Sequence, residues 1–157
     1  MNRVFLAAAA LIAVPATAQA QSVTAANPVG MAAALKENGY TVEMDTDAVG
    51  DPRIKTDLNG WESFILFYGC DDETHGNCDS VQLSTGFDRT TPMKPERALA
   101  IAYKYRFLAV SLDNEGDPYL KWDIITDKGI PQAVFLHSLK RYSEVLDSAA
   151  EIIFEDE

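Results

Sequence analysis

Hydrophobic residues recur along this chain with two different periods, and the period separates expected helices from expected strands. From Phe135 to Ile153 the apolar side chains step by three and four residues, which predicts one long amphipathic helix beginning near Pro131. Asn27 followed by Pro28 suits a helix start, and the sequence predicts a helix over 28–38. A further helix is expected to open at Thr91-Pro92 and to end near residue 105.

The remaining segments read as short strands separated by turn residues. The pattern predicts strands at 40–46, 53–58, 61–70, 79–87, 107–112 and 119–125, with a hairpin turn at 113–118. The order is therefore helix, four strands, helix, two strands, helix. This order predicts an α+β fold, in which an antiparallel sheet is packed against helices.

One of these strands differs from the others because its apolar residues do not alternate with polar ones. The run consists of Phe64, Ile65, Leu66, Phe67 and Tyr68. A strand of this kind is expected to be central and covered on both faces. Helices can cover one face, and the other face needs the remaining helix, a second copy of the chain or a client. The five residues are therefore the predicted partner-binding surface.

The first twenty residues have the pattern of a secretory signal peptide. Arg3 precedes an apolar run at 4–14, and Ala18-Gln19-Ala20 fits a small-x-small cleavage site. The run is shorter than the roughly 20 residues that span a bilayer. We therefore expect a cleaved signal peptide at 1–20, a flexible arm at 21–26 and a single domain at 27–157, in a periplasmic protein without membrane insertion. The acidic residues at 155–157 oppose the helix dipole, so we expect that end to fray.

Charge limits the classes of partner. The chain has 13 basic and 24 acidic residues and a net charge of −11. A field of this sign disfavours nucleic acids and anionic lipid surfaces.

Two cysteines lie at the ends of neighbouring expected strands, with an acidic loop between them. Because the hairpin brings Cys70 and Cys78 together and the export compartment is oxidising, we expect a disulfide. The competing interpretation is a zinc site formed by both cysteines, His75 and a nearby aspartate, but the seven-residue gap is unlike a structural zinc chelate. A redox pair would need the closer C-x-x-C spacing. A protein that binds a small ligand or metal through the acidic 71–79 loop is the alternative function.

Catalysis has few candidate residues in this sequence. His75 and His137 are the only histidines, and no nucleophile elbow, H-E-x-x-H or phosphate-binding loop is present. We therefore expect a protein that is not an enzyme and that needs no cofactor.

Several short motifs support a family resemblance. They are Gly39-Tyr40, the stretch 51–54 (DPRI), 67–70 (FYGC), 78–83 (CDSVQL) and 106–117, which ends in LDNEGD. On these residues the chain resembles the YbjN domain family, labelled bacterial sensory transduction regulators. It departs from the pattern at Tyr103-Lys104, where the family has Trp-Asn, and at Tyr142, where the family has Trp.

The resemblance implies a type III secretion chaperone-like fold, with a sheet backed by helices. Proteins of that fold are often dimers and hold extended peptides, and no catalytic residues come with it. The combined prediction is a non-enzymatic periplasmic module, chaperone-like or regulatory, that binds an unidentified protein or peptide client or a second copy of itself.

Overall fold

Six strands form one antiparallel sheet in the computed structural model, which describes residues 21–157. The strand order is β2-β3-β4-β5-β7-β6, so β4 is an internal strand, as its apolar run predicts. The strands are β2 (Glu43–Thr46), β3 (Pro52–Leu58), β4 (Trp61–Tyr68), β5 (Ser80–Gly86), β6 (Ala109–Leu112) and β7 (Pro118–Ile125). A separate two-stranded sheet pairs β1 (Ser22–Val23) with β8 (Ile130–Pro131).

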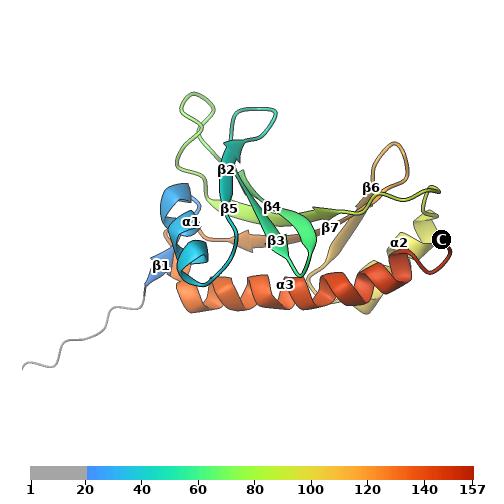
Figure 1. Ribbon diagram of the computed structural model, residues 1–157. Helices are drawn as coiled ribbons and strands as arrows, with labels where there is room; N and C mark the ends of the chain where they lie inside the picture. Colours follow the sequence, from blue (N-terminus) through green and yellow to red (C-terminus); the bar gives the residue numbers. More distant parts are fainter. Residues whose placement is uncertain (1–20) are drawn as a thin grey trace, which may run out of the picture.

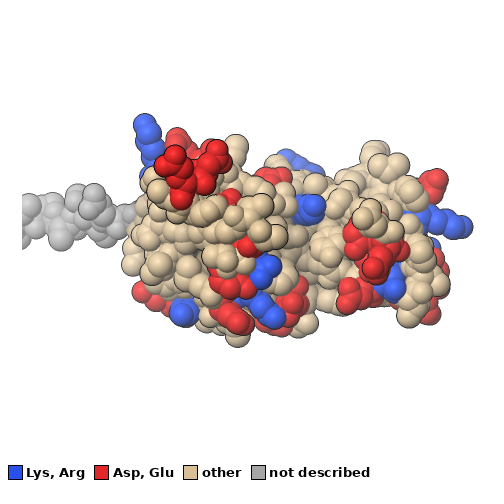
Figure 2. Space-filling view, turned by 90° about the horizontal axis from the view of Figure 1, so that it is seen from above, with Lys and Arg blue, Asp and Glu red and all other residues tan. Residues whose placement is uncertain are grey.

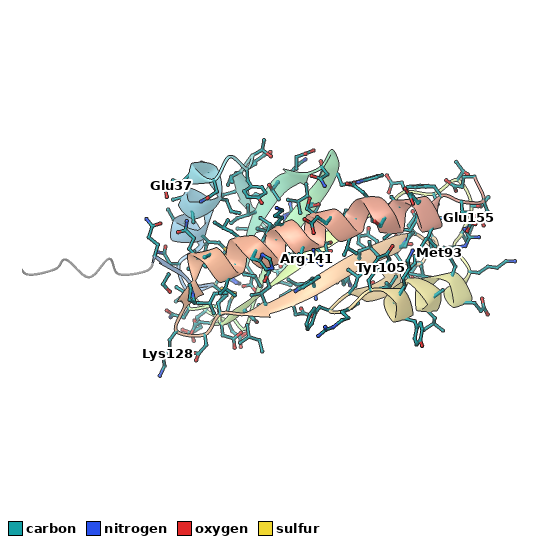
Figure 3. All side chains as sticks on the ribbon, turned by 90° about the horizontal axis from the view of Figure 1, so that it is seen from below. Glu37, Met93, Tyr105, Lys128, Arg141 and Glu155 are labelled. Atoms are coloured by element: carbon teal, nitrogen blue, oxygen red, sulfur yellow. A yellow bond between two sulfur atoms is a disulfide. The ribbon has the colours of Figure 1, made fainter. Side chains whose placement is uncertain are left out.

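The helices all lie on one side of this sheet. They are α1 (Pro28–Glu37), α2 (Pro95–Lys104) and α3 (Gln132–Ile153). Helix α3 runs the length of the sheet, and α1 and α2 lie beside it near its two ends (Figures 1 and 3). The loops between β2 and β3 and between β4 and β5 rise from the opposite side of the sheet at one end, and the β6–β7 loop rises at the other end (Figure 1). The predicted α+β architecture is confirmed.

The core lies between α3 and the sheet. Helix α3 places Phe135, Leu139, Tyr142 and Leu146 in it with no exposed surface, as the helical period predicts. The Tyr142 hydroxyl lies 2.7 Å from the Leu120 carbonyl oxygen, to which it donates, and 2.9 Å from the Thr85 hydroxyl. Burial raises the pKa of this phenol, while its hydrogen bond to Thr85 acts in the opposite direction. The only phenol of the α3 stripe is thus neutral and hydrogen-bonded in the core.

Local signals account for the start of α1. The Asn27 side chain accepts a hydrogen bond from the Gly30 amide at 3.0 Å, and Pro28 follows at the first helical position. Helix α2 begins at Pro95, four residues after the expected start at Thr91. The start of the intervening segment is held by the C-terminus instead, because the Thr91 amide donates to the Glu157 carboxylate, as do the amide and hydroxyl of the preceding Thr90.

Both ends of the described chain are more ordered than the sequence suggested. Residues 21–26, expected as a flexible arm, instead pack into the fold. Val23 and Ala25 are buried, and the Ala25 amide donates to the Thr126 hydroxyl at 2.8 Å. The segment is held by the burial of these two side chains, by this hydrogen bond and by the pairing of β1 with β8.

The C-terminal acids do not fray, because two arginines hold them. The Asp156 carboxylate accepts from Arg89 at 2.7 Å and from Arg97 at 2.9 Å, and the Arg89 side chain is almost completely buried. The hydrogen bond from Arg89 lowers the pKa of Asp156 below its usual value. A lowered pKa means that the ionised form favours the folded state, so this contribution is lost as the pH falls below about 4.

The expected signal peptide at 1–20 lies outside the described residues. Among residues 21–157, no helix combines the length and apolar content that crossing a bilayer requires.

Candidate functional site

The side of the sheet opposite the helices is the candidate interaction surface, and we call it the open face. Along β4 the side chains alternate between the two sides. Ile65 and Phe67 point toward α3 and are fully buried, whereas Phe64 and Leu66 are half-buried and Tyr68 is exposed on the open face. The expectation of cover on both faces is therefore wrong for the chain as described, because the three helices of residues 21–157 share one side.

The centre of the open face combines apolar side chains with charged neighbours. In the strand register, Leu66 lies between Arg53 of β3 and Gln82 of β5. The Arg53 guanidinium lies 4.8 Å from the centre of the Phe64 ring and pairs with Asp45. The hydrogen bond from Arg53 lowers the pKa of Asp45. Arg53 thus covers part of the apolar surface of Phe64.

Charges are distributed over this face without a field of one sign. Figure 2 shows acidic and basic side chains interspersed among uncharged ones. Lys55 pairs with Glu62, and the Gln82 side chain donates to Asp123 at 2.8 Å. These charged and polar side chains are thus paired with one another on the open face.

Two large apolar side chains remain exposed at one end of the open face. Tyr68 is 45% exposed and Ile125 is 77% exposed. They belong to one row across the sheet, because Ser80 pairs with Tyr68 on one side and with Ile125 on the other. Ile125 was not among the predicted residues, although its place in the alternation of β7 could have identified it.

The cysteine-bounded loop follows directly after Tyr68. The Cys70 and Cys78 sulfur atoms lie 2.09 Å apart, at disulfide distance. Within the loop, Asp71 accepts hydrogen bonds from the Thr74 amide at 2.9 Å and the Glu73 amide at 3.1 Å. The hydrogen bonds from Thr74 and Glu73 lower the pKa of Asp71. This carboxylate stabilises the turn, which is a structural use of one of the acids considered for ligand binding.

His75 connects the loop to its neighbour. Its Nδ1 lies 2.9 Å from the Asp51 carboxylate in the β2–β3 loop, and its ring packs over Gly50. His75 is thus directed toward Asp51, whereas a zinc site would need it with the cysteines. Among residues 21–157, no three His, Cys, Asp or Glu side chains are grouped so that they could hold a metal ion.

We expect Cys70 and Cys78 to be disulfide-bonded in the folded protein. Alkylation of the folded protein without reductant, followed by mass spectrometry, should find no modified cysteine. Cys70→Ser should lower the free energy of unfolding by about 2 kcal/mol, because a loop constraint on the unfolded chain is lost. The unsubstituted protein measured with reductant is the matched control and should lose a similar amount. Two alkylated thiols, or zinc retained through purification, would contradict the disulfide.

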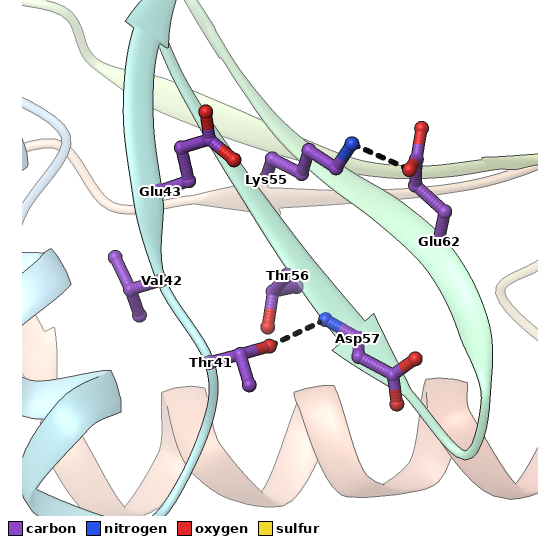
Figure 4. Close-up of a pocket in the computed structure, with 7 residues that line it drawn as sticks. All are labelled: Thr41, Val42, Glu43, Lys55, Thr56, Asp57 and Glu62. Atoms are coloured by element: carbon purple, nitrogen blue, oxygen red, sulfur yellow. Dashed lines mark hydrogen bonds and ion pairs between the residues drawn. The ribbon is translucent and has the colours of Figure 1, made fainter.

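A shallow notch lies at the edge of the sheet where β2 separates from β3. Its volume is about 280 Å³, and Thr41, Lys55 and Glu62 are among its lining residues (Figure 4). The Thr41 hydroxyl accepts a hydrogen bond from the Asp57 amide at 3.0 Å and so replaces the missing strand contact. The Lys55–Glu62 ion pair joins β3 to β4 at one side of the notch (Figure 4). The buried Thr56 hydroxyl has no hydrogen-bond partner among residues 21–157, but Thr41, Lys55 and Glu62 are all engaged with the chain's own groups, so we do not choose the notch as the binding site.

Comparisons with known proteins agree with this architecture. The model of the YbjN family, described as "Putative bacterial sensory transduction regulator", matches residues 27–155. The crystal structure of an uncharacterized protein from Methanothermobacter thermautotrophicus is similar, with a TM-score of 0.55 and 14% sequence identity. The similarity covers 83% of this chain and 97% of that one. At this identity it shows a shared fold alone. A search of the curated proteins gives no significant match.

Proposed function

The chain belongs to the YbjN family, and from that premise we propose that it is an exported, non-enzymatic interaction protein that binds a client polypeptide on the open face of its sheet. The single observation that carries the proposal is the uncovered side of β4. An internal strand places Phe64, Leu66 and Tyr68 on a surface that no helix of residues 21–157 covers.

The composition of the open face suits a polypeptide better than a purely apolar ligand. A bound segment can place apolar side chains against Leu66, Tyr68 and Ile125, while Arg53 and Asp123 offer charged partners of both signs nearby. Interfaces of this kind combine an apolar centre with a polar rim. The Arg53 side chain is partly exposed, so a bound segment can reach it.

The proposal has two further parts, namely that the protein is not an enzyme and that it is located in the periplasm. The family description is that of a regulator, which fits recognition of another molecule. His75 is bound to Asp51 and His137 is exposed on α3, and the sequence has no nucleophile elbow or H-E-x-x-H motif that would give either histidine a catalytic role. Export is supported by the signal-like pattern at 1–20 and by the close cysteine pair.

A photo-crosslinking amino acid placed at single positions tests the proposal in the native host. p-Benzoylphenylalanine at Tyr68 or at Ile125 should give crosslinks to a defined polypeptide on illumination. The same amino acid at Tyr103 is the control, because this tyrosine is 94% exposed but lies on α2, on the helix side. Mass spectrometry of the product separates a client from a second copy of the chain.

Two outcomes would overturn the proposal. One is equal crosslinking from Tyr103 and from the open face, which would indicate nonspecific contact. The other is the absence of any defined product at Tyr68 and Ile125. A product that contains only this chain would replace the client with a homodimer formed through the same face.

A further inference from the structure

A groove of about 430 Å³ lies on the helix side of the sheet, between α3, β7 and the segment that joins α2 to β6. Figure 3 shows Arg141 on α3, and Tyr105, just after the end of α2, also lines the groove. The site is independent of the open face, since the two lie on opposite sides of the sheet. Its residues are distant in sequence, which is why the sequence pattern did not identify it.

Two aromatic side chains form an apolar surface in the groove. The centres of the Phe107 and Trp122 rings lie 5.3 Å apart. Trp122 in turn lies edge-on to Tyr142 in the core, with the ring centres 6.3 Å apart. Phe107 is 68% exposed and has a φ of 64°, a left-handed conformation that is unfavourable for a large side chain. The tight α2–β6 connection thus holds a phenylalanine in the solvent, where it extends the aromatic surface of Trp122.

Basic side chains surround this aromatic surface, and no acid lines the groove. Lys104, Arg106, His137 and Arg141 all line it. Among the described residues Lys104 and Arg106 have no ion-pair partner, and Arg141 shares its charge with Glu144 at 2.8 Å. In a chain with 24 acidic and 13 basic residues, such a group of cations over an aromatic surface favours an anion.

We propose that this groove binds a small aromatic carboxylate. The flat body of the ligand stacks on Phe107 and Trp122, and its carboxylate lies among Lys104, Arg106 and Arg141. The volume falls within the range of small-molecule sites, roughly 300 to 1,000 Å³. Tyr105 also lines the groove, and its buried hydroxyl has no hydrogen-bond partner among the described residues.

Titration of the mature protein with 1-naphthoate, followed by the indole NH signals of its two tryptophans in ¹H–¹⁵N NMR spectra, tests this proposal. The Trp122 signal, assigned with Trp122→Phe, should shift saturably, while that of Trp61 should not. The neutral isostere 1-naphthamide should bind about tenfold more weakly, because it cannot use the cations. The double substitution Lys104→Gln and Arg106→Gln should cause a similar loss.

Lys36→Gln with Lys128→Gln is the matched control, because it removes the same charge at exposed lysines outside the groove. The control should retain the affinity of the unsubstituted protein. Equal binding of the amide and the carboxylate, an equal loss in the control, or no saturable shift at Trp122 would each overturn the proposal. None of these three outcomes affects the crosslinking test of the open face, so the two proposals can fail independently.

Discussion

Ile65→Glu is expected to unfold the domain, whereas Leu66→Glu, one residue further along β4, is expected to leave it folded. Ile65 is completely buried, and its neighbours across the sheet are Ile54 and Leu83, which are buried as well. A carboxylate at this position would have no partner in the core. The cost should exceed about 4 kcal/mol, a large share of the stability of a typical domain.

A carboxylate in place of Leu66 has a different environment. It would lie between Arg53 and Gln82 on the open face, within reach of a guanidinium and of solvent. The free energy of unfolding should change by less than about 1 kcal/mol. Crosslinking from Tyr68 should nevertheless be lost, because the new charge lies in the centre of the proposed binding surface.

Circular dichroism during urea unfolding measures both stabilities, and crosslinking yield measures the interaction. If both substitutions unfold a protein that is monomeric at high concentration, the two sides of β4 are equally internal and the open-face proposal fails. If Leu66→Glu folds and crosslinks as before, the client does not use this surface.

The fold class could be predicted because the local patterns are strong. The helical period of 135–153 determines which residues of α3 are buried, and the alternation of β5 buries Val81 and Leu83 on one side. The uninterrupted apolar run of β4 correctly indicated an internal strand. These features depend on residues that are close together along the chain, so they can be recognised in a single sequence.

The arrangement of layers could not be predicted in the same way. An apolar run shows that both sides of a strand tolerate burial, but the side on which each helix packs depends on its connections to the sheet. The three helices of residues 21–157 lie on one side, and Arg53 partly covers Phe64 on the other. The groove could not be predicted either, because Phe107, Trp122 and Arg141 come from separate elements and meet only in the folded chain.

Leu139→Ala should lower the free energy of unfolding by roughly 2 to 4 kcal/mol, because α3 fixes the position of the whole helical layer. Leu139 has no exposed surface and lies in the buried stripe between Phe135 and Tyr142. Its truncation removes apolar burial and leaves a cavity in a closely packed region. Leu99→Ala on α2 is the matched control, since Leu99 is 69% exposed and should lose less than about 0.5 kcal/mol. Urea unfolding of both variants gives the comparison. If Leu139→Ala also lost less than about 0.5 kcal/mol, α3 would pack only loosely on the sheet. A partner could then reach the helix side of β4 as well as the open face.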